Sequence, residues 1–243
     1  MILKKFDKLP DEFQNEDVYK YYRILKKKKL SIFLKRVFDF IIALFALIVL
    51  TPLIVAISII IKCDSPGEII FKQKRITTYG KVFHIYKFRT MYTGSEKGSQ
   101  VTVNNDSRVT KAGRFLRKYR LDELLQVLNI LKGEMSFVGT RPEVEKYVNC
   151  YTDEMYATLL LPAGVTSLAS IKYKDEEKLL ADSKNVDVTY VNDILKQKMK
   201  FNLQYVSRFS VFYDIVLMVK TVLAVFKSDE CETADKEDKP VNV

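Results

Sequence analysis

The 243-residue chain contains few of the residues that build metal sites and disulfide frameworks. Its three cysteines, Cys63, Cys150 and Cys231, are far apart and odd in number, which excludes a zinc-ligand spacing or a disulfide scaffold and fits a reducing compartment. The single histidine, His84, lies in an alternating strand-like run, where a structural role is simpler than that of a catalytic base. There is no glycine-rich or low-complexity stretch, and no signal peptide is visible.

The chain carries more basic than acidic residues. Lysine and arginine number 40 against 30 aspartates and glutamates, a formal net charge of +10. Beside a membrane segment, such an excess favours anionic lipid headgroups or phosphorylated substrates. A nucleic-acid-binding protein is the alternative, but no helix-turn-helix, zinc-finger or aromatic-platform pattern accompanies the charge. We therefore expect membrane lipids, and no nucleic acid, among the partners.

One long apolar run, Val37 to Ile61, contains a single charge and is long enough to cross a bilayer at about 1.5 Å per residue. Pro52 lies in its middle, where proline removes a backbone hydrogen bond and kinks a helix. Cations flank both ends, Lys26 to Lys29 before the run and Lys62 after it, so both ends favour the cytoplasmic side. We predict a re-entrant helix broken at Pro52, in preference to a straight span.

Short elements follow the apolar run. The turn sequence Asp64 to Gly67 precedes two strand-like runs, Ile69 to Phe71 and Lys81 to Phe88, which predict a β-hairpin. The polar stretch Thr93 to Asp106 predicts a mobile loop. Leucines at helical spacing then predict a helix from Leu121 to Leu131.

The C-terminal region predicts one more helix and a tail. Gly133 supplies a C-terminal cap for the helix predicted from Leu121 to Leu131. Val211 to Phe226 is apolar but short, which suits an interfacial amphipathic or core helix, and residues 228–243 predict a disordered tail. The expected fold is α+β, mostly helical, in a monotopic membrane protein. Its segments are a polar and basic N-terminal part (1–36), the membrane helix (37–61), a catalytic domain (62–227) and the tail (228–243).

The densest chemistry lies between Gly113 and Pro142. The adjacent carboxylates of Asp122 and Glu123 are preceded by a cluster of cations and followed by a Gly-Thr-Arg-Pro turn. The cations are Lys111, Arg114, Arg117, Lys118 and Arg120. Phosphate-binding cations around two carboxylates indicate a phosphorylated substrate with a metal ion between the like charges. An acidic pair that only caps a helix is the simpler alternative.

These residues resemble the bacterial sugar transferases, in particular the small monotopic phosphoglycosyl transferases that act on polyprenyl phosphate. The resemblance covers about Lys35 to Lys227. Its matching blocks are Lys35–Asp39, Asp64–Gly67, Tyr86–Met91, Asp106–Thr110, Gly113–Arg117, Leu121–Leu124, Leu131–Ser136, Gly139–Pro142, Pro162–Thr166 and Asp187–Val191. Each block alone is weak, whereas their order and spacing together are specific.

The resemblance implies transfer of a phosphosugar from an NDP-sugar, usually a UDP-sugar, to polyprenyl (undecaprenyl) phosphate with Mg²⁺. The products are polyprenyl-diphospho-sugar and NMP, formed through a covalent phosphosugar on an aspartate. It implies the first step of polysaccharide or glycoconjugate assembly, on the cytoplasmic face of the bacterial inner membrane. A carboxylate can attack a diphosphate when a metal and cations neutralise the repelling charge.

Residue roles follow from the same resemblance. Asp122 is the implied nucleophile, and Glu123 assists with metal binding or proton transfer. Asp187 is a further acidic group near the metal. The implied phosphate-binding residues are Arg117 for the prenyl phosphate, Arg141 for the nucleotide diphosphate, and Lys87, Arg89 and Arg114 as further candidates.

Three positions depart from the family pattern, namely Leu125, Thr140 and Ser167. They leave the charged residues intact and are expected to affect loop geometry and substrate preference. A catalytically silent scaffold of a polysaccharide assembly complex is the alternative from another class, although such a protein has no need of two carboxylates amid cations. The sequence does not fix the transferred sugar, and it leaves a homo-oligomer open.

Overall fold

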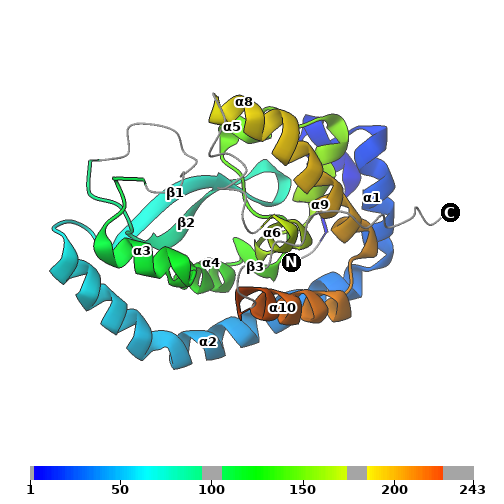
Figure 1. Cartoon of the computed structure of the whole chain (residues 1–243). Coiled ribbons are helices and arrows are strands. Elements are labelled where there is room, and N and C mark those ends of the chain that lie inside the picture. Colours follow the sequence, from blue (N-terminus) through cyan, green and yellow to red (C-terminus); the bar gives the residue numbers. More distant parts are fainter. Residues whose placement is uncertain (1–2, 95–105, 174–184, 227–243) are drawn as a thin grey trace.

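The computed structural model describes residues 3–94, 106–173 and 185–226, and these form a mostly helical body with two small sheets (Figure 1). This agrees with the predicted α+β, mostly helical class. Most of the loop predicted at Thr93 to Asp106 and the whole predicted tail lie outside the described residues.

The N-terminal half contains α1 (Glu16–Lys27), α2 (Lys29–Asp64), β1 (Ile70–Ile76), β2 (Val82–Phe88), α3 (Lys111–Lys118) and α4 (Gln126–Lys132). The C-terminal half contains β3 (Met135–Val138), α5 (Glu145–Val148), β4 (Ala163–Thr166), α6 (Leu168–Lys172), α8 (Val186–Thr189), α9 (Lys196–Arg208) and α10 (Val211–Phe226). Elements that are far apart in the chain pack together, as α2 does with α4 and α10.

The apolar run forms one helix, α2, that is longer than predicted and continues through Pro52. The prediction of a break at Pro52 is therefore wrong. Proline removes a single N–H, and a helix with several turns on either side tolerates this loss as a kink. The Thr51 hydroxyl donates to the Leu47 carbonyl at 2.7 Å, a contact that also bends helices. In Figure 1, α2 follows an arc whose two ends rise toward the rest of the molecule.

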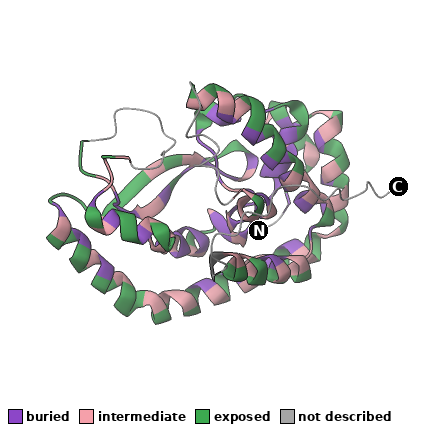
Figure 2. Cartoon of the chain, viewed as in Figure 1, coloured by how far each residue is buried: buried purple, intermediate pink, exposed green. Residues whose placement is uncertain are grey.

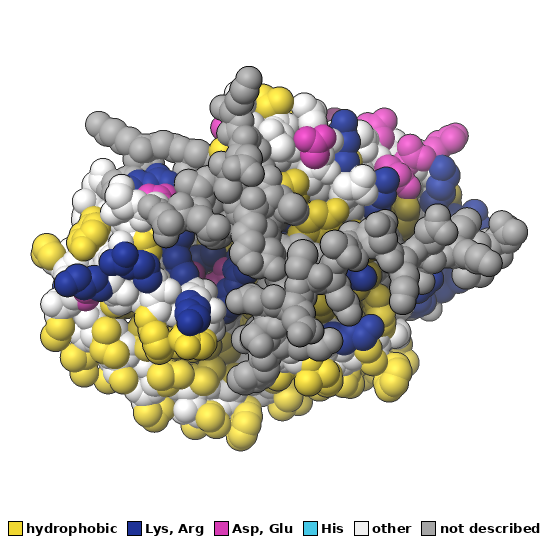
Figure 3. Space-filling view, in the orientation of Figure 1, with side chains coloured by type: hydrophobic (Ala, Val, Ile, Leu, Met, Phe, Trp, Pro, Cys, Tyr) yellow, Lys and Arg dark blue, Asp and Glu magenta, His cyan; other side chains and the backbone are white. Residues whose placement is uncertain are grey.

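The outer side of α2 is covered with exposed apolar side chains. Figure 2 marks much of this helix as exposed, and Figure 3 shows hydrophobic side chains along the same lower edge of the molecule. Phe45 and Ile48 are 64% and 67% exposed, which is unusual for residues of this size in a protein surrounded by water. Phe212 and Leu223 extend the exposed apolar surface onto α10. Among the described residues, α2 is the one helix long and apolar enough to cross a membrane.

Buried polar contacts hold α2 against the body. The Lys35 ammonium lies 2.6 Å from one oxygen of Asp214 on α10 and 3.9 Å from Asp39 on its own helix. The Tyr205 hydroxyl donates to the second oxygen of Asp214 at 2.8 Å. The residue after Lys35, Arg36, donates to the Ile130 and Leu131 carbonyls in the last turn of α4, at 2.6 and 3.0 Å, and so ties this helix end to α2.

The predicted hairpin is confirmed, and both strands are seven residues long with antiparallel pairing from Ile70–Phe88 to Ile76–Val82. Asn129 on α4 fastens the free edge of β2, because its amide accepts from the Tyr86 N–H and donates to the His84 carbonyl. These contacts hold α4 against the hairpin, while α3 and α4 both pack on α2, so the two helices form a layer between the hairpin and α2 (Figure 1).

A second, parallel sheet of β3 and β4 was not predicted. Its strands are four residues long, and the backbone of Gly139, which follows β3, meets that of Gly164 near the start of β4: a Cβ on Gly164 would lie 2.1 Å from the Gly139 nitrogen. This close approach requires glycine at the contact.

Candidate functional site

The acidic pair lies on a short 3-10 turn, Leu121–Glu123, between α3 and α4. Arg120 precedes it with a left-handed backbone (φ 56°), and α4 begins only at Gln126. The prediction of one helix starting at Leu121 is therefore wrong, because the reversal at Arg120 and the tight turn use up the first predicted turn. The C-terminal cap at Gly133 is confirmed, with φ 83°.

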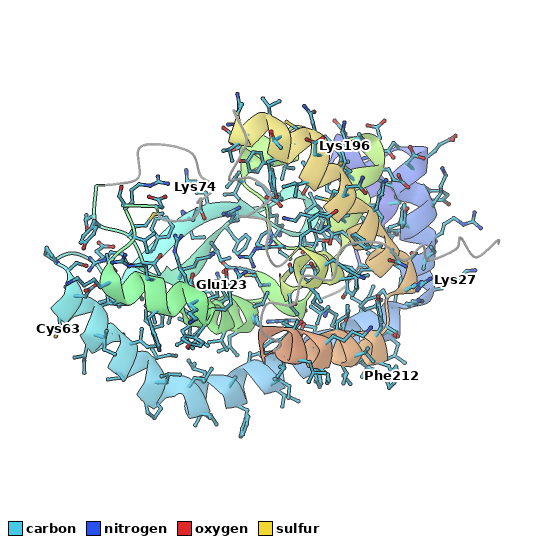
Figure 4. All side chains as sticks on the ribbon, in the orientation of Figure 1. Lys27, Cys63, Lys74, Glu123, Lys196 and Phe212 are labelled. Atoms are coloured by element: carbon cyan, nitrogen blue, oxygen red, sulfur yellow. The ribbon has the colours of Figure 1, made fainter. Side chains whose placement is uncertain are left out.

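Glu123 lies between two cations from different elements. Its Oε1 accepts from Lys87 on β2 at 2.9 Å, and both of its oxygens accept from the Arg141 guanidinium, which follows β3. Figure 4 shows Glu123 below the hairpin, on the turn that precedes α4. In the same orientation, Figure 3 shows acidic atoms at the bottom of a hollow bordered by Lys and Arg side chains. The structure thus brings together three of the residues named in the sequence analysis, Lys87, Glu123 and Arg141.

The two carboxylates have opposite electrostatic environments. Burial raises the pKa of Asp122, and Lys87 opposes this rise while the neighbouring Glu123 adds to it. Burial alone would also raise the pKa of Glu123, but Arg141 and Lys87 hold it well below its ordinary value. Burial lowers the pKa of Lys87, and Glu123 opposes that change. Among the described residues, none donates a hydrogen bond to the Asp122 carboxylate, which leaves its oxygens available to a ligand.

Arg117 and Arg114 lie on α3, the helix that precedes the acidic pair, and of the two only Arg117 has an electrostatic effect on Asp122. Arg117 is half-buried, and its Nε donates to the Thr90 hydroxyl at 2.9 Å. Its charge opposes the rise in the pKa of Asp122 that burial causes. Arg114 is exposed on the same helix. The helix is fixed at its start by Gly113, where a Cβ would lie 2.1 Å from the Thr90 carbonyl oxygen.

Arg89 is not part of this cluster. Its guanidinium is buried at the end of α2, where it donates to the carbonyls of Ser65 and Pro66 at 2.7 and 2.9 Å. The neighbouring Gly67 has φ +122°, and a Cβ there would lie 2.3 Å from the Arg89 Nη1. Asp64 accepts from the first turn of α3 at 3.1 Å. The Asp-Ser-Pro-Gly turn and Arg89 therefore join the end of α2 to the hairpin and α3.

Asp187 also lies outside the cluster. It is on α8, beside α5, where its oxygens accept from Lys146 and the Tyr147 hydroxyl, both at 2.7 Å (Figure 1). Within the three described ranges, no group of three metal-ligating side chains comes together. Asp122, with its free oxygens, is chemically suited to Mg²⁺, which takes one or two carboxylates together with water and substrate phosphates.

A second buried network, missed by the sequence analysis, supports Arg141. Glu143 accepts from the Tyr190 hydroxyl at 2.6 Å, and the Lys198 ammonium donates to the same hydroxyl at 3.0 Å. Arg75 on β1 donates to the Pro142 carbonyl at 3.3 Å. These contacts fix the turn that carries Arg141 to β1 and α9. The available signals were Glu143 beside the Gly-Thr-Arg-Pro turn and Tyr190 in the Asp187–Val191 block.

The exposed apolar arc is typical of a protein that associates with a membrane, and carboxylates held among cations are chemically suited to anionic substrates. The chain belongs to the bacterial sugar transferase family, whose sequence model matches residues 30–228.

Three relatives illustrate the similarity. A UDP-N-acetylgalactosamine-undecaprenyl-phosphate N-acetylgalactosaminephosphotransferase of Aeromonas hydrophila is 34% identical over 198 residues, covering 79% of this chain and 44% of the relative. A UDP-glucose:undecaprenyl-phosphate glucose-1-phosphate transferase of Escherichia coli K12 is 33% identical, covering 79% and 40%. The exopolysaccharide production protein ExoY of Rhizobium meliloti is 35% identical, covering 79% and 84%. The chain thus spans about two fifths of the first two relatives and most of the third.

Proposed function

We propose that the protein is an enzyme that transfers a phosphosugar from a UDP-sugar to undecaprenyl phosphate, releasing UMP, at the start of polysaccharide assembly. The observation that carries the proposal is the pair Asp122–Glu123 buried among Lys87, Arg117 and Arg141. The names of the relatives, which contain UDP-sugars and undecaprenyl phosphate, support the substrate classes.

The proposed reaction has two steps at Asp122. Its carboxylate attacks the phosphorus next to the sugar, the bond to the UMP oxygen breaks, and the phosphosugar remains as an acyl phosphate on Asp122. A phosphate oxygen of the lipid then attacks that phosphorus, which forms the diphosphate and returns the carboxylate. Arg141 and Lys87 neutralise the donor diphosphate, and Arg117 binds the lipid phosphate.

Mg²⁺ is the proposed cofactor, with Asp122 as a ligand and Glu123 as the second acidic group. When bound, the ion would supply positive charge against the diphosphate, which lowers the repulsion that the attacking carboxylate meets. Asp187 would join it only after a rearrangement of α8, because its oxygens are held by Lys146 and Tyr147.

The membrane arrangement completes the proposal. We propose that α2 enters and leaves the bilayer on the cytoplasmic face, with α10 lying flat beside it. The arc of α2 in Figure 1, the proline inside this helix and the exposed apolar side chains of both helices support this arrangement. The lipid phosphate sits at headgroup depth, so a shallow helix keeps the site within its reach.

Release of UMP tests the reaction. The purified chain in nanodiscs, with undecaprenyl phosphate and Mg²⁺, should release UMP from one member of a panel of UDP-sugars. Asp122→Asn should abolish the release, because the amide is a poor nucleophile. Normal turnover in that variant contradicts the mechanism. If the wild type releases no UMP from any UDP-sugar of a full panel, the scaffold alternative is favoured.

Two labelling sites test the membrane arrangement. Cys63 lies exposed at the far end of α2 (Figure 4) and can be retained in a chain that lacks the other cysteines. A matched chain carries Lys27→Cys as its single cysteine, at the opposite end of the arc. A membrane-impermeant maleimide should label both from the cytoplasmic side. Labelling of either one from the far side would indicate a straight span.

A further inference from the structure

We infer that Glu123 occupies, in the chain without ligand, the anion site that the donor diphosphate takes over, so that donor binding displaces its carboxylate. The inference rests on the proposed function and adds an exchange of anions to it.

The contacts of Glu123 have the form of a bound phosphate. The fork of Arg141 meets both carboxylate oxygens, with Nη1 at 3.2 Å from Oε2 and Nη2 on Oε1, while Lys87 approaches Oε1 at 2.9 Å. Arginine binds two oxygens of a phosphate with the same planar fork, and lysine adds a point charge. The carboxylate therefore stands where two phosphate oxygens would be held.

The exposed fractions show which partner a ligand from solution reaches first. The side chain of Glu123 is 11% exposed, against 20% for Lys87 and 28% for Arg141. Both cations thus have surface beyond that covered by Glu123. A diphosphate carries more negative charge than one carboxylate, so it competes for both cations from that open side.

Asp122 provides a natural contrast. It carries the same charge one residue earlier, but no described residue donates a hydrogen bond to its carboxylate, and its pKa is raised by burial while that of Glu123 is lowered by Arg141 and Lys87. Removal of either charge changes the field of the site similarly, whereas only Glu123 blocks the two cations. Comparison of variants at Asp122 and Glu123 therefore distinguishes occupation of the two cations by a carboxylate from a general effect of negative charge.

The exchange gives Glu123 a defined role in the order of events. Its carboxylate is released only when an anion has taken its cations. Any action of Glu123 toward metal or a proton then depends on a bound donor.

Binding of UDP in the absence of metal tests the exchange, because UDP contains the diphosphate and no sugar to transfer. Calorimetry on the full chain in nanodiscs with EDTA compares the wild type with Glu123→Gln, Glu123→Asp and Asp122→Asn. The apparent affinity for UDP is the intrinsic affinity multiplied by the fraction of chains in which Glu123 has already left the two cations. Removal of the Glu123 carboxylate should therefore tighten UDP binding about tenfold. Glu123→Asp keeps the charge but is too short to bridge both cations, and should also bind UDP more tightly. Asp122→Asn should stay within about twofold of the wild type.

The outcomes distinguish the exchange from the proposed function. If both Glu123 variants bind UDP no more tightly than Asp122→Asn, the exchange is overturned while the transferase proposal stands. If Glu123→Gln and Asp122→Asn both bind UDP more tightly while Glu123→Asp does not, loss of a negative charge alone explains the gain and the exchange is also overturned. If no variant binds UDP even with Mg²⁺ restored, the proposed donor class is wrong. A cooperative melting transition well above the temperature of the titration shows that each variant is folded.

Discussion

Replacement of Lys35 by methionine should detach α10 from α2, because Lys35 is the cation of a buried cluster. Its side chain and that of Asp214 are each 4% exposed, and Asp39 is equally buried. Loss of the ammonium leaves two carboxylates buried without a cation, at a cost of about 3–5 kcal/mol. For a chain of this size, about 2–4 °C per kcal/mol corresponds to a melting temperature lower by about 6–20 °C.

The assay is thermal unfolding of purified protein in detergent, followed by the tyrosine signal. Lys29→Met is the matched control, since Lys29 is exposed on the same helix, and its effect should stay within about 0.5 kcal/mol. Lys35→Met with Asp214→Asn should recover part of the loss, because the double variant buries one charge fewer. If Lys35→Met has the same melting temperature as Lys29→Met, the cluster does not hold the two helices together and the reasoning is refuted.

Three further changes test local features of the fold. Gly67→Ala should lower the melting temperature through its clash with Arg89. The effect should exceed that of Gly94→Ala, since Gly94 also has a positive φ (+85° against +122°) but a Cβ there meets nothing within 4 Å. Asn129→Leu leaves two backbone groups of β2 without partners and should cost about 1–3 kcal/mol in unfolding free energy, measured by denaturant titration. The lowered pKa of Glu123 stabilises the fold above the ordinary glutamate value of 4.5 and loses this contribution as pH falls through the folded value. The stability gap between wild type and Glu123→Gln, measured by melting at several pH values, should therefore narrow in acid; a constant gap would contradict the ion pairs.

The site was predictable where the chemistry is local in the chain. Arg117, Asp122 and Glu123 lie within seven residues, and the Gly-Thr-Arg-Pro turn marks Arg141 a short distance on. Lys87 and Arg89 look equivalent in sequence because residues two apart share one face of a strand. The strand ends at Phe88, however, and Arg89 points instead into the end of α2.

The rest of the site depends on long-range packing that no local pattern encodes. The contact between Glu143 and Tyr190 joins residues 47 positions apart, and that between Lys35 and Asp214 joins residues 179 apart. The helix predicted from Leu121 was wrong because apolar spacing does not reveal the left-handed backbone at Arg120. The spacing of short apolar runs also cannot reveal which of them pair as β3 and β4.

Trapping of the covalent intermediate tests the central claim most directly. The chain is mixed with Mg²⁺ and the UDP-sugar that supports UMP release, without lipid acceptor, and is digested for mass spectrometry. We predict a phosphosugar on the peptide that contains Asp122, formed together with UMP, absent from Asp122→Asn and lost when undecaprenyl phosphate is added. UMP release that requires the lipid, with no adduct on Asp122, would contradict the account and indicate direct transfer between the two substrates.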